Sequence, residues 1–423
     1  MFNHLKKLGP GLLVTAAFIG PGTVTTASKA GASFGFTLVW TLVFSTLAAI
    51  VLQEMSARLG LVTRQGLGEA VRGTFGNPLL RMLACFLIVA AIAFGNAAYQ
   101  TGNITGAVIG LEELTNWRPA LTLLAASDPA ESLQLRIWPL LLGGAAGLLL
   151  ASGAHQLIER VLVFLVVLMG VVFTVTAVMV RPEIVEILKG AFVPTVPDGA
   201  LLTVIGLIGT TVVPYNLFLH ASWVQNKWPK SQNMEESLGE MRLDNALSIG
   251  LGGLVTLAIM STAAAAFFST GKGIESAAQM AEQLEPLLGS AAKWFFAIGL
   301  CAAGLTSSIT APLAAAYATA GALGWTVELK SWKFRTVWLI VLIAGTLLAA
   351  LLGKSPTQTI LIAQVANGLL LPLVAVFLLI AANRPSVMGK FSNGWFANLI
   401  GVGVVVIAAG LGIYKVLAQF GLF

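Results

Sequence analysis

Charged residues are scarce in this chain of 423 residues: only 10% are Asp, Glu, Lys or Arg, whereas 57% are hydrophobic. The apolar residues recur in runs of about 20, which is the length that crosses a hydrocarbon core of about 30 Å. Between these runs no stretch is long enough for a soluble domain. The composition therefore excludes a soluble protein and predicts a polytopic membrane protein.

Cysteine and histidine are also rare, with two and three residues in the whole chain. Cys85 and Cys301 lie inside apolar runs and the histidines are scattered, so neither a disulfide nor a metal site is predicted from ligand spacing. No Ser-His-Asp set or phosphate-cradling loop argues for an enzyme. The net charge of +6 fits basic loops beside a membrane better than nucleic acid. We therefore expect no enzyme activity, no cofactor, no metal-ligating side chains and no nucleic-acid partner.

Eleven apolar segments predict eleven membrane-spanning helices in one all-α domain over residues 1–423. The predicted spans are 10–33, 36–58, 79–110, 136–153, 157–180, 200–225, 243–269, 289–322, 335–352, 358–382 and 395–417. Most of the 24 basic residues then fall on the side of the amino terminus. The positive-inside rule predicts a cytoplasmic amino terminus and, since the number of spans is odd, a carboxyl terminus outside. We expect the protein in the plasma membrane.

The first span is interrupted at its middle by Gly20-Pro21-Gly22-Thr23. Proline removes a backbone donor and glycine disfavours helix by about 1 kcal/mol, so the helix should break here. In a membrane such a break is tolerated only where protein encloses it or a cavity borders it. The break therefore predicts a site inside the protein.

The sixth span carries a second break, Val213-Pro214-Tyr215-Asn216. Residues 201–209 before it echo residues 12–20 before the first break. Two interrupted helices at corresponding places in two halves are typical of a transporter whose substrate binds near the midplane. A proline kink used only for packing is the alternative interpretation of each break.

These breaks resemble those of the Nramp (natural resistance-associated macrophage protein) family of divalent-metal transporters, which have the LeuT fold. In that family the first helix breaks at Asp-Pro-Gly-Asn and the sixth at Met-Pro-His-Asn. Further matching stretches are residues 52–63, 217–220, 306–310, 383–385 and 388–389. Together, in order and at the right spans, they cover nearly the whole chain.

The resemblance implies a five-plus-five inverted repeat and transport by alternating access. Repeat one would cover residues 10–180, repeat two residues 200–382, and an extra helix residues 395–417. It also implies that helices one and six are unwound at the breaks.

The resemblance also implies which residues face the substrate, and here the chain departs from the family. The family holds its metal with the Asp and Asn of the first break and the Met of the sixth; the matching residues here are Gly20, Thr23 and Val213. The Asp and Glu of the family's third span correspond to Gln100 and Asn103. The chain thus resembles a divergent member without the usual metal-binding side chains.

Uncharged polar residues take their place. The predicted substrate-binding set is Gly20, Gly22, Thr23, Gln100, Asn103, Val213, Tyr215, Asn216 and Gln364. Since a dehydrated divalent ion needs an anionic partner, this set favours a small anion or a neutral polar solute. A divalent metal ion, Mn²⁺ or hydrated Mg²⁺, is the alternative substrate, and a non-transporting sensor is the second alternative. The solute and any coupling ion stay open.

Several of these polar residues also have a purely structural interpretation. The hydroxyls of Thr25 and Thr26 can bond carbonyls four residues back. Gln100 and Asn103 can simply join neighbouring spans. His220, one turn beyond the second break, can pack against or bond to a neighbouring helix.

Overall fold

The computed structural model of the chain describes residues 19–124, 133–152, 155–228, 233–271, 273–328, 330–352 and 355–419. Within these ranges nine helices are long and apolar enough to cross a membrane, and α7 is a shorter apolar helix. The first predicted span is represented by its second half, α3; residues 10–18 of that span lie outside the described residues. Each of the eleven predicted spans therefore corresponds to helix, and the helical membrane fold is confirmed.

The spanning helices are α3 (Pro21–Phe34), α4 (Val39–Thr63), α6 (Pro78–Thr115), α7 (Ile137–Ser152), α8 (His155–Val180), α10 (Leu201–Thr211), α11 (Pro214–Lys227), α12 (Met234–Phe267), α15 (Ala292–Leu323), α16 (Trp332–Leu351), α17 (Pro356–Ala382) and α19 (Trp395–Gln419). Shorter helices connect them: α5 (Leu67–Thr74), α9 (Ile184–Phe192), α13 (Ala277–Glu282), α14 (Glu285–Leu288) and α18 (Pro385–Met388).

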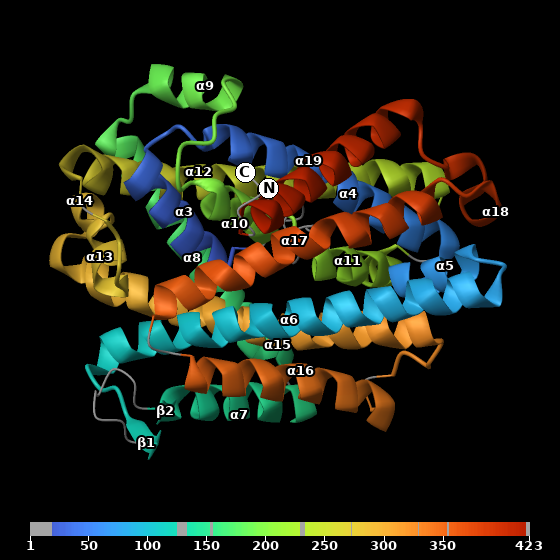
Figure 1. Cartoon of the computed structure of the whole chain (residues 1–423), viewed down its shortest axis with the longest axis horizontal. Coiled ribbons are helices and arrows are strands. Elements are labelled where there is room, and N and C mark those ends of the chain that lie inside the picture. Colours follow the sequence, from blue (N-terminus) through green and yellow to red (C-terminus); the bar gives the residue numbers. More distant parts are fainter. Residues whose placement is uncertain are drawn as a thin grey trace.

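One element departs from the all-α prediction. Strands β1 (Ala120–Leu124) and β2 (Leu133–Arg136) pair antiparallel, with Ala120 opposite Arg136. Leucines alternate with other residues in both segments, which is a period-two pattern, but each run is too short to stand out from a loop. The hairpin and α13 lie at one end of the molecule, called here the hairpin end. The opposite end, with α5 and α18, is called the α5 end (Figure 1).

Several helix ends follow from local chemistry. The side chain of Asn77 accepts a hydrogen bond from the Leu79 N–H at 2.9 Å and caps α6. Asn233 caps α12 in the same way through the Glu235 N–H. Gly324 ends α15 in the left-handed conformation (φ 70°), which glycine adopts without a Cβ penalty.

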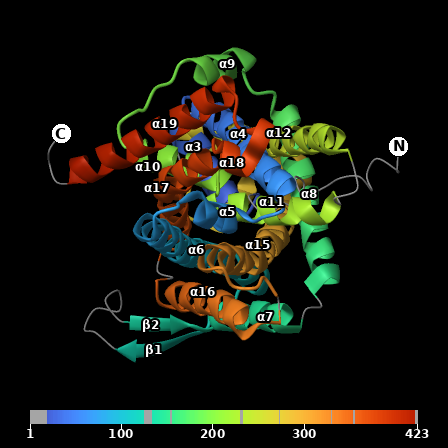
Figure 2. The same cartoon turned by 90° about the vertical axis from the view of Figure 1, so that its right-hand side faces the viewer.

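Helices of the first half pack against their counterparts in the second half. The third span of each half, α6 and α15, runs beside its counterpart along the long axis of the molecule (Figure 1). The fourth spans of the two halves, α7 and α16, lie below them in this view. The second span of the first half, α4, packs against that of the second half, α12, and the broken spans α3 and α10 pack against each other. This pairing is what an inverted repeat of five-plus-five helices produces; the repeat boundaries themselves stay a prediction. Figure 2 shows α6 and α15 between the α7–α16 pair and the helices that surround α3.

The α6–α15 contact depends on a glycine. A Cβ added at Gly304 would lie 2.5 Å from the Ala107 nitrogen and 2.6 Å from the Asn103 carbonyl oxygen. Small residues let membrane helices approach this closely, and the gain is close van der Waals packing. Gly304 thus fixes the distance between the two helices that carry one wall of the site described below.

Replacing Gly304 with Ala should therefore separate α6 from α15. We expect a loss of about 1–3 kcal/mol from overpacking, seen as a lower unfolding temperature in detergent. Gly250→Ala is the matched control, because no atom lies within 4 Å of the added Cβ and alanine favours helix. Equal unfolding temperatures for the two variants would contradict the packing described here.

Candidate functional site

The first break lies at Gly20. This residue is extended (φ −109°, ψ −173°), and α3 begins at Pro21, the first helical position. Proline suits this position because its missing N–H would have no helical partner there. The first turn of α3 contains no acidic residue. The positive end of the α3 dipole is therefore not neutralised by a side chain of its own first turn.

The second break has the same design. α10 ends at Thr211, Val212 and Val213 are non-helical, and Val213 is extended (φ −73°, ψ 118°). α11 then begins with Pro214 at its first helical position. The second predicted interruption is confirmed, with helix on both sides of it. At the first, the structure shows the far side, where extended Gly20 is followed by proline and α3; the half of the span before it lies outside the described residues.

The two breaks lie beside each other. The hydroxyl oxygens of Thr23 in α3 and Thr210 in α10 are 2.8 Å apart, and both side chains are fully buried. The rings of Tyr99 in α6 and Tyr215 in α11 meet edge to face, with centroids 5.2 Å apart. Helices α3, α6, α10 and α11 thus converge on one buried place, as the matched breaks predicted. Thr210 and Tyr99 are members of it that the sequence analysis missed.

Hydroxyl groups occupy the space beside Gly20. A Cβ at this residue would lie 2.9 Å from Ser307 Oγ and 3.7 Å from the Tyr99 hydroxyl oxygen. About two helical turns beyond Tyr99 on α6, Gly106 packs directly on the Pro21 ring. Ser307 belongs to the stretch 306–310 that carried the family resemblance, and this was the signal that could have found it.

Gln364 of α17 lies against the other glycine of the first break. A Cβ at Gly22 would be 2.2 Å from Gln364 Nε2, and one at Gly102 would be 3.7 Å from the same atom. The amide therefore fills the space between α3 and α6. Neither its nitrogen nor its oxygen has a hydrogen-bond partner, although the side chain is fully buried.

Other polar groups around the breaks are likewise buried without a partner. Both amide atoms of Asn103 and of Asn216 lack one, and so do the hydroxyls of Thr25 and Thr26. The two threonines thus do not bond carbonyls four residues back. Asn103 lies on the face of α6 shared by Tyr99 and Gly106, which both touch the first break. An unpaired buried amide costs about 1–3 kcal/mol, so such a cluster indicates a place for a ligand or water.

The site contains no charged side chain among the described residues. The buried charged side chains in those ranges are Arg58 and Glu112, and each lies near the end of its helix. The breaks therefore offer hydroxyl and amide dipoles and backbone groups, with no carboxylate to balance a cation.

Two predicted residues play different parts from the rest. Gln100 donates its amide to the Ser308 carbonyl at 3.2 Å and packs on Gly345 of α16, on the side of α6 away from Gly102. Gln100 therefore joins α6 to α15 and α16, which is the structural role considered for it. The structure does not bring its side chain to the breaks. Val213 offers an apolar side chain, so only its backbone groups can contact a polar substrate; its carbonyl also accepts from the Asn216 N–H at 3.1 Å.

His220 also has a structural partner. Its Nδ1 lies 3.0 Å from Gln53 Oε1, and both side chains are buried. This hydrogen bond ties α11 to α4 one turn beyond the break, which is the neighbouring-helix bond considered for it.

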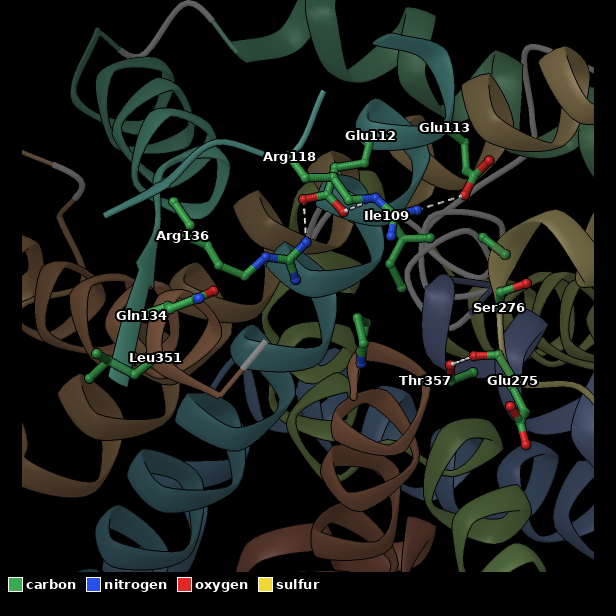
Figure 3. Close-up of a pocket in the computed structure, with 13 residues that line it drawn as sticks. Ile109, Glu112, Glu113, Arg118, Gln134, Arg136, Glu275, Ser276, Leu351 and Thr357 are labelled. Carbon is green, nitrogen blue, oxygen red and sulfur yellow. Dashed lines mark hydrogen bonds and ion pairs between the residues drawn. The ribbon is translucent and has the colours of Figure 1, made fainter. Parts of the chain in front are cut away.

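A cavity of about 310 Å³ opens at the hairpin end (Figure 3). Arg118 and Arg136 reach from the hairpin segment to Glu112 and Glu113 at the end of α6, and Thr357 donates to the Glu275 carbonyl at 2.7 Å. Thr357 precedes Gln364 by about two turns of α17, or roughly 10 Å. Gln364 and the other predicted site residues are not among the residues that line this cavity.

Comparison with known proteins decides the family. The sequence model described as "Natural resistance-associated macrophage protein-like" matches residues 11–418. The chain belongs to the Nramp family. Two Nramp relatives, both named divalent metal cation transporter MntH, come from Yersinia enterocolitica and Pectobacterium carotovorum. Each is 30% identical, over 415 and 412 residues respectively; the alignments cover 97% of this chain and 94% and 93% of the relatives.

Solved structures agree on the fold. The manganese transporter of Eremococcus coleocola superposes with a TM-score of 0.76 at 22% identity, over 98% of this chain and 86% of that one. Mhp1, a nucleobase-cation-symport-1 family transporter, superposes with a TM-score of 0.58 at 14% identity, over 99% and 94%. The chain is therefore a membrane transporter of the Nramp family with the LeuT-type fold.

The space beside Gly20 can be tested by restoring a carboxylate. Gly20→Asp alone should destabilise the protein, because its Cβ would press on Ser307 Oγ. Adding Ser307→Ala removes that contact, so the double variant should fold and bind Mn²⁺ at least about tenfold more tightly than the natural protein. Isothermal titration in detergent measures this.

Gly20→Asn with Ser307→Ala is the control of equal size without the charge. It should leave Mn²⁺ affinity unchanged. Equal affinities of the Asp and Asn double variants would show that position 20 does not face the ion.

Proposed function

We propose that this Nramp protein is a secondary transporter that moves a divalent metal cation by alternating access, and that the ion passes the two breaks with part of its water shell. The observation that carries this is the buried, uncharged meeting point of α3 and α10 in a transporter fold. The predicted substrate-binding residues other than Gln100 would surround the ion there.

The relatives support a metal as the substrate. Proteins that align over nearly the whole chain are named divalent metal cation transporters. Because the carboxylate is missing at Gly20, the sequence favours an anion or neutral solute. The comparisons do not support that preference and favour its alternative, a divalent metal ion.

The neutral site supports transport of a hydrated ion. Removing all water from a divalent ion in a medium of low dielectric costs tens of kcal/mol unless anionic ligands replace it. Mg²⁺ in particular gives up its water reluctantly and usually keeps several molecules. The unpaired amides of Asn103, Asn216 and Gln364 can accept hydrogen bonds from such water molecules.

Burial of the breaks supports alternating access. Thr23, Asn216 and Gln364 are at most 1% exposed, so the site is closed from both ends in this structure. The non-helical residues Gly20, Val212 and Val213 are the points at which the half-helices can swing. Opening at the hairpin end would join the site to the cavity of Figure 3. On the predicted orientation in the plasma membrane, that end faces outward.

A small anion or neutral polar solute is the second candidate. It is favoured by one observation, the α3 amino terminus with no acidic residue in its first turn. A sensor without transport has less support, because the named relatives are transporters.

Uptake into proteoliposomes tests the proposal. We expect saturable entry of Mn²⁺ or Mg²⁺, reported by an enclosed fluorescent chelator, and no protein-dependent entry of bicarbonate or small carboxylates. Entry of an anion without either cation would replace the first candidate with the second. The absence of flux for every solute would favour a sensor.

Two glutamines give a matched pair of variants. Gln364→Met should slow uptake about tenfold, because one hydrogen-bonding group at the breaks is lost. Gln100→Met makes the same change on the far side of α6 and should stay within about twofold of the natural rate. Equal slowing by both variants would contradict the placement of the site.

A further inference from the structure

A second cavity lies at the α5 end, far from the breaks. Its volume is about 360 Å³, and it opens between α4, α12 and the segment that joins α18 to α19. Its charged lining consists of Glu54, Arg58, Arg242 and Lys390, and its apolar lining includes Val51 and Phe396. The cavity thus carries three positive charges and one negative charge.

Arg58 lines the cavity, but its donors are already engaged by other residues of the protein. It is 3% exposed, donates to Glu54 at 3.0 Å, and also donates to the Phe391 carbonyl and to Asn393. This pair balances the charge of Glu54. Arg58 therefore acts as a positioning residue that fixes the 391–393 segment against α4.

Arg242 and Lys390 are the available cations. The Arg242 side chain is 56% exposed and contacts Glu54 through Nε at 2.9 Å, so the donors of its terminal NH₂ groups are not needed for this contact. Lys390 is 71% exposed and pairs with Glu235, itself 73% exposed. Exposed pairs of this kind contribute less than about 1 kcal/mol, so an anion can displace them.

The rim of the cavity is apolar and continues onto the membrane-facing surface. Trp395 and Phe396 at the start of α19 are 77% and 60% exposed. Leu243 and Leu247 on α12 are 62% and 58% exposed. Aromatic residues at the end of a spanning helix are typical of the membrane–water interface. A ligand held by Arg242 and Lys390 would therefore have an apolar body along these side chains.

We propose that this cavity binds an anionic phospholipid. Its phosphate contacts Arg242 and Lys390, and its acyl chains follow the apolar surface of α12 and α19. Charge complementarity and the continuous apolar face select a lipid over a free ion. On the predicted orientation the cavity faces the cytoplasmic leaflet, where basic pockets between helices take anionic headgroups.

The test compares lipids on the purified full-length protein. We expect phosphatidylglycerol in mixed micelles to raise the unfolding temperature and to be retained through purification, with phosphatidylcholine doing neither. Inorganic phosphate alone should have no effect. Stabilisation by phosphate alone, or equally by phosphatidylcholine, would overturn a site for an anionic lipid.

Charge-removing variants locate the effect. Arg242→Gln with Lys390→Gln should weaken phosphatidylglycerol binding about tenfold. Both side chains are exposed, so folding should be retained. Lys333→Gln with Arg384→Gln removes the same charge from exposed positions outside the cavity lining and should bind as the natural protein does. Equal weakening in both double variants would mean general surface attraction and would refute the site.

Discussion

The structure depends on the rule that a helix interrupted inside a membrane must be enclosed by protein. The freed backbone groups at Gly20 and Val213 cannot turn to water, so other helices surround them. Thr23 bonds to Thr210 across the two breaks, and Gly106 receives the Pro21 ring. Helices α6, α15 and α17 then pack closely around this centre, because glycines where they touch let their backbones approach.

Charged residues and uncharged polar residues occupy different parts of the molecule. The uncharged polar residues gather at the breaks, whereas clusters of ion pairs lie at the two ends of the molecule, around Glu112 at one end and around Glu54 at the other. On the proposed function, a centre of this kind would hold an ion less tightly than a carboxylate would, because dipoles stabilise an ion less. The ends, in contrast, hold segments in place: Arg136 ties the hairpin to α6, and Arg58 ties the 391–393 segment to α4.

Much of this arrangement could be predicted from the sequence. Hydrophobic runs indicated the spans, and glycine with proline indicated both breaks, because these signals are local and strong. Which side of α6 faces the breaks was harder to predict from the sequence. Gln100 and Asn103 are three residues apart, yet only Asn103 lies on the face of α6 that touches α3. Ser307, Tyr99 and Thr210 were missed because their place depends on packing between distant segments. The hairpin was missed because two short leucine-rich runs resemble loop.

The central claim is that the ion between the breaks is held through water. Anomalous diffraction from the protein with bound Mn²⁺ tests it most directly. The account predicts one peak between residues 20–23 and 213–216, with the nearest protein oxygens roughly 4 Å away, beyond a water layer. A peak with protein oxygens at about 2.1 Å on every side, or a peak elsewhere and none at the breaks, would contradict it.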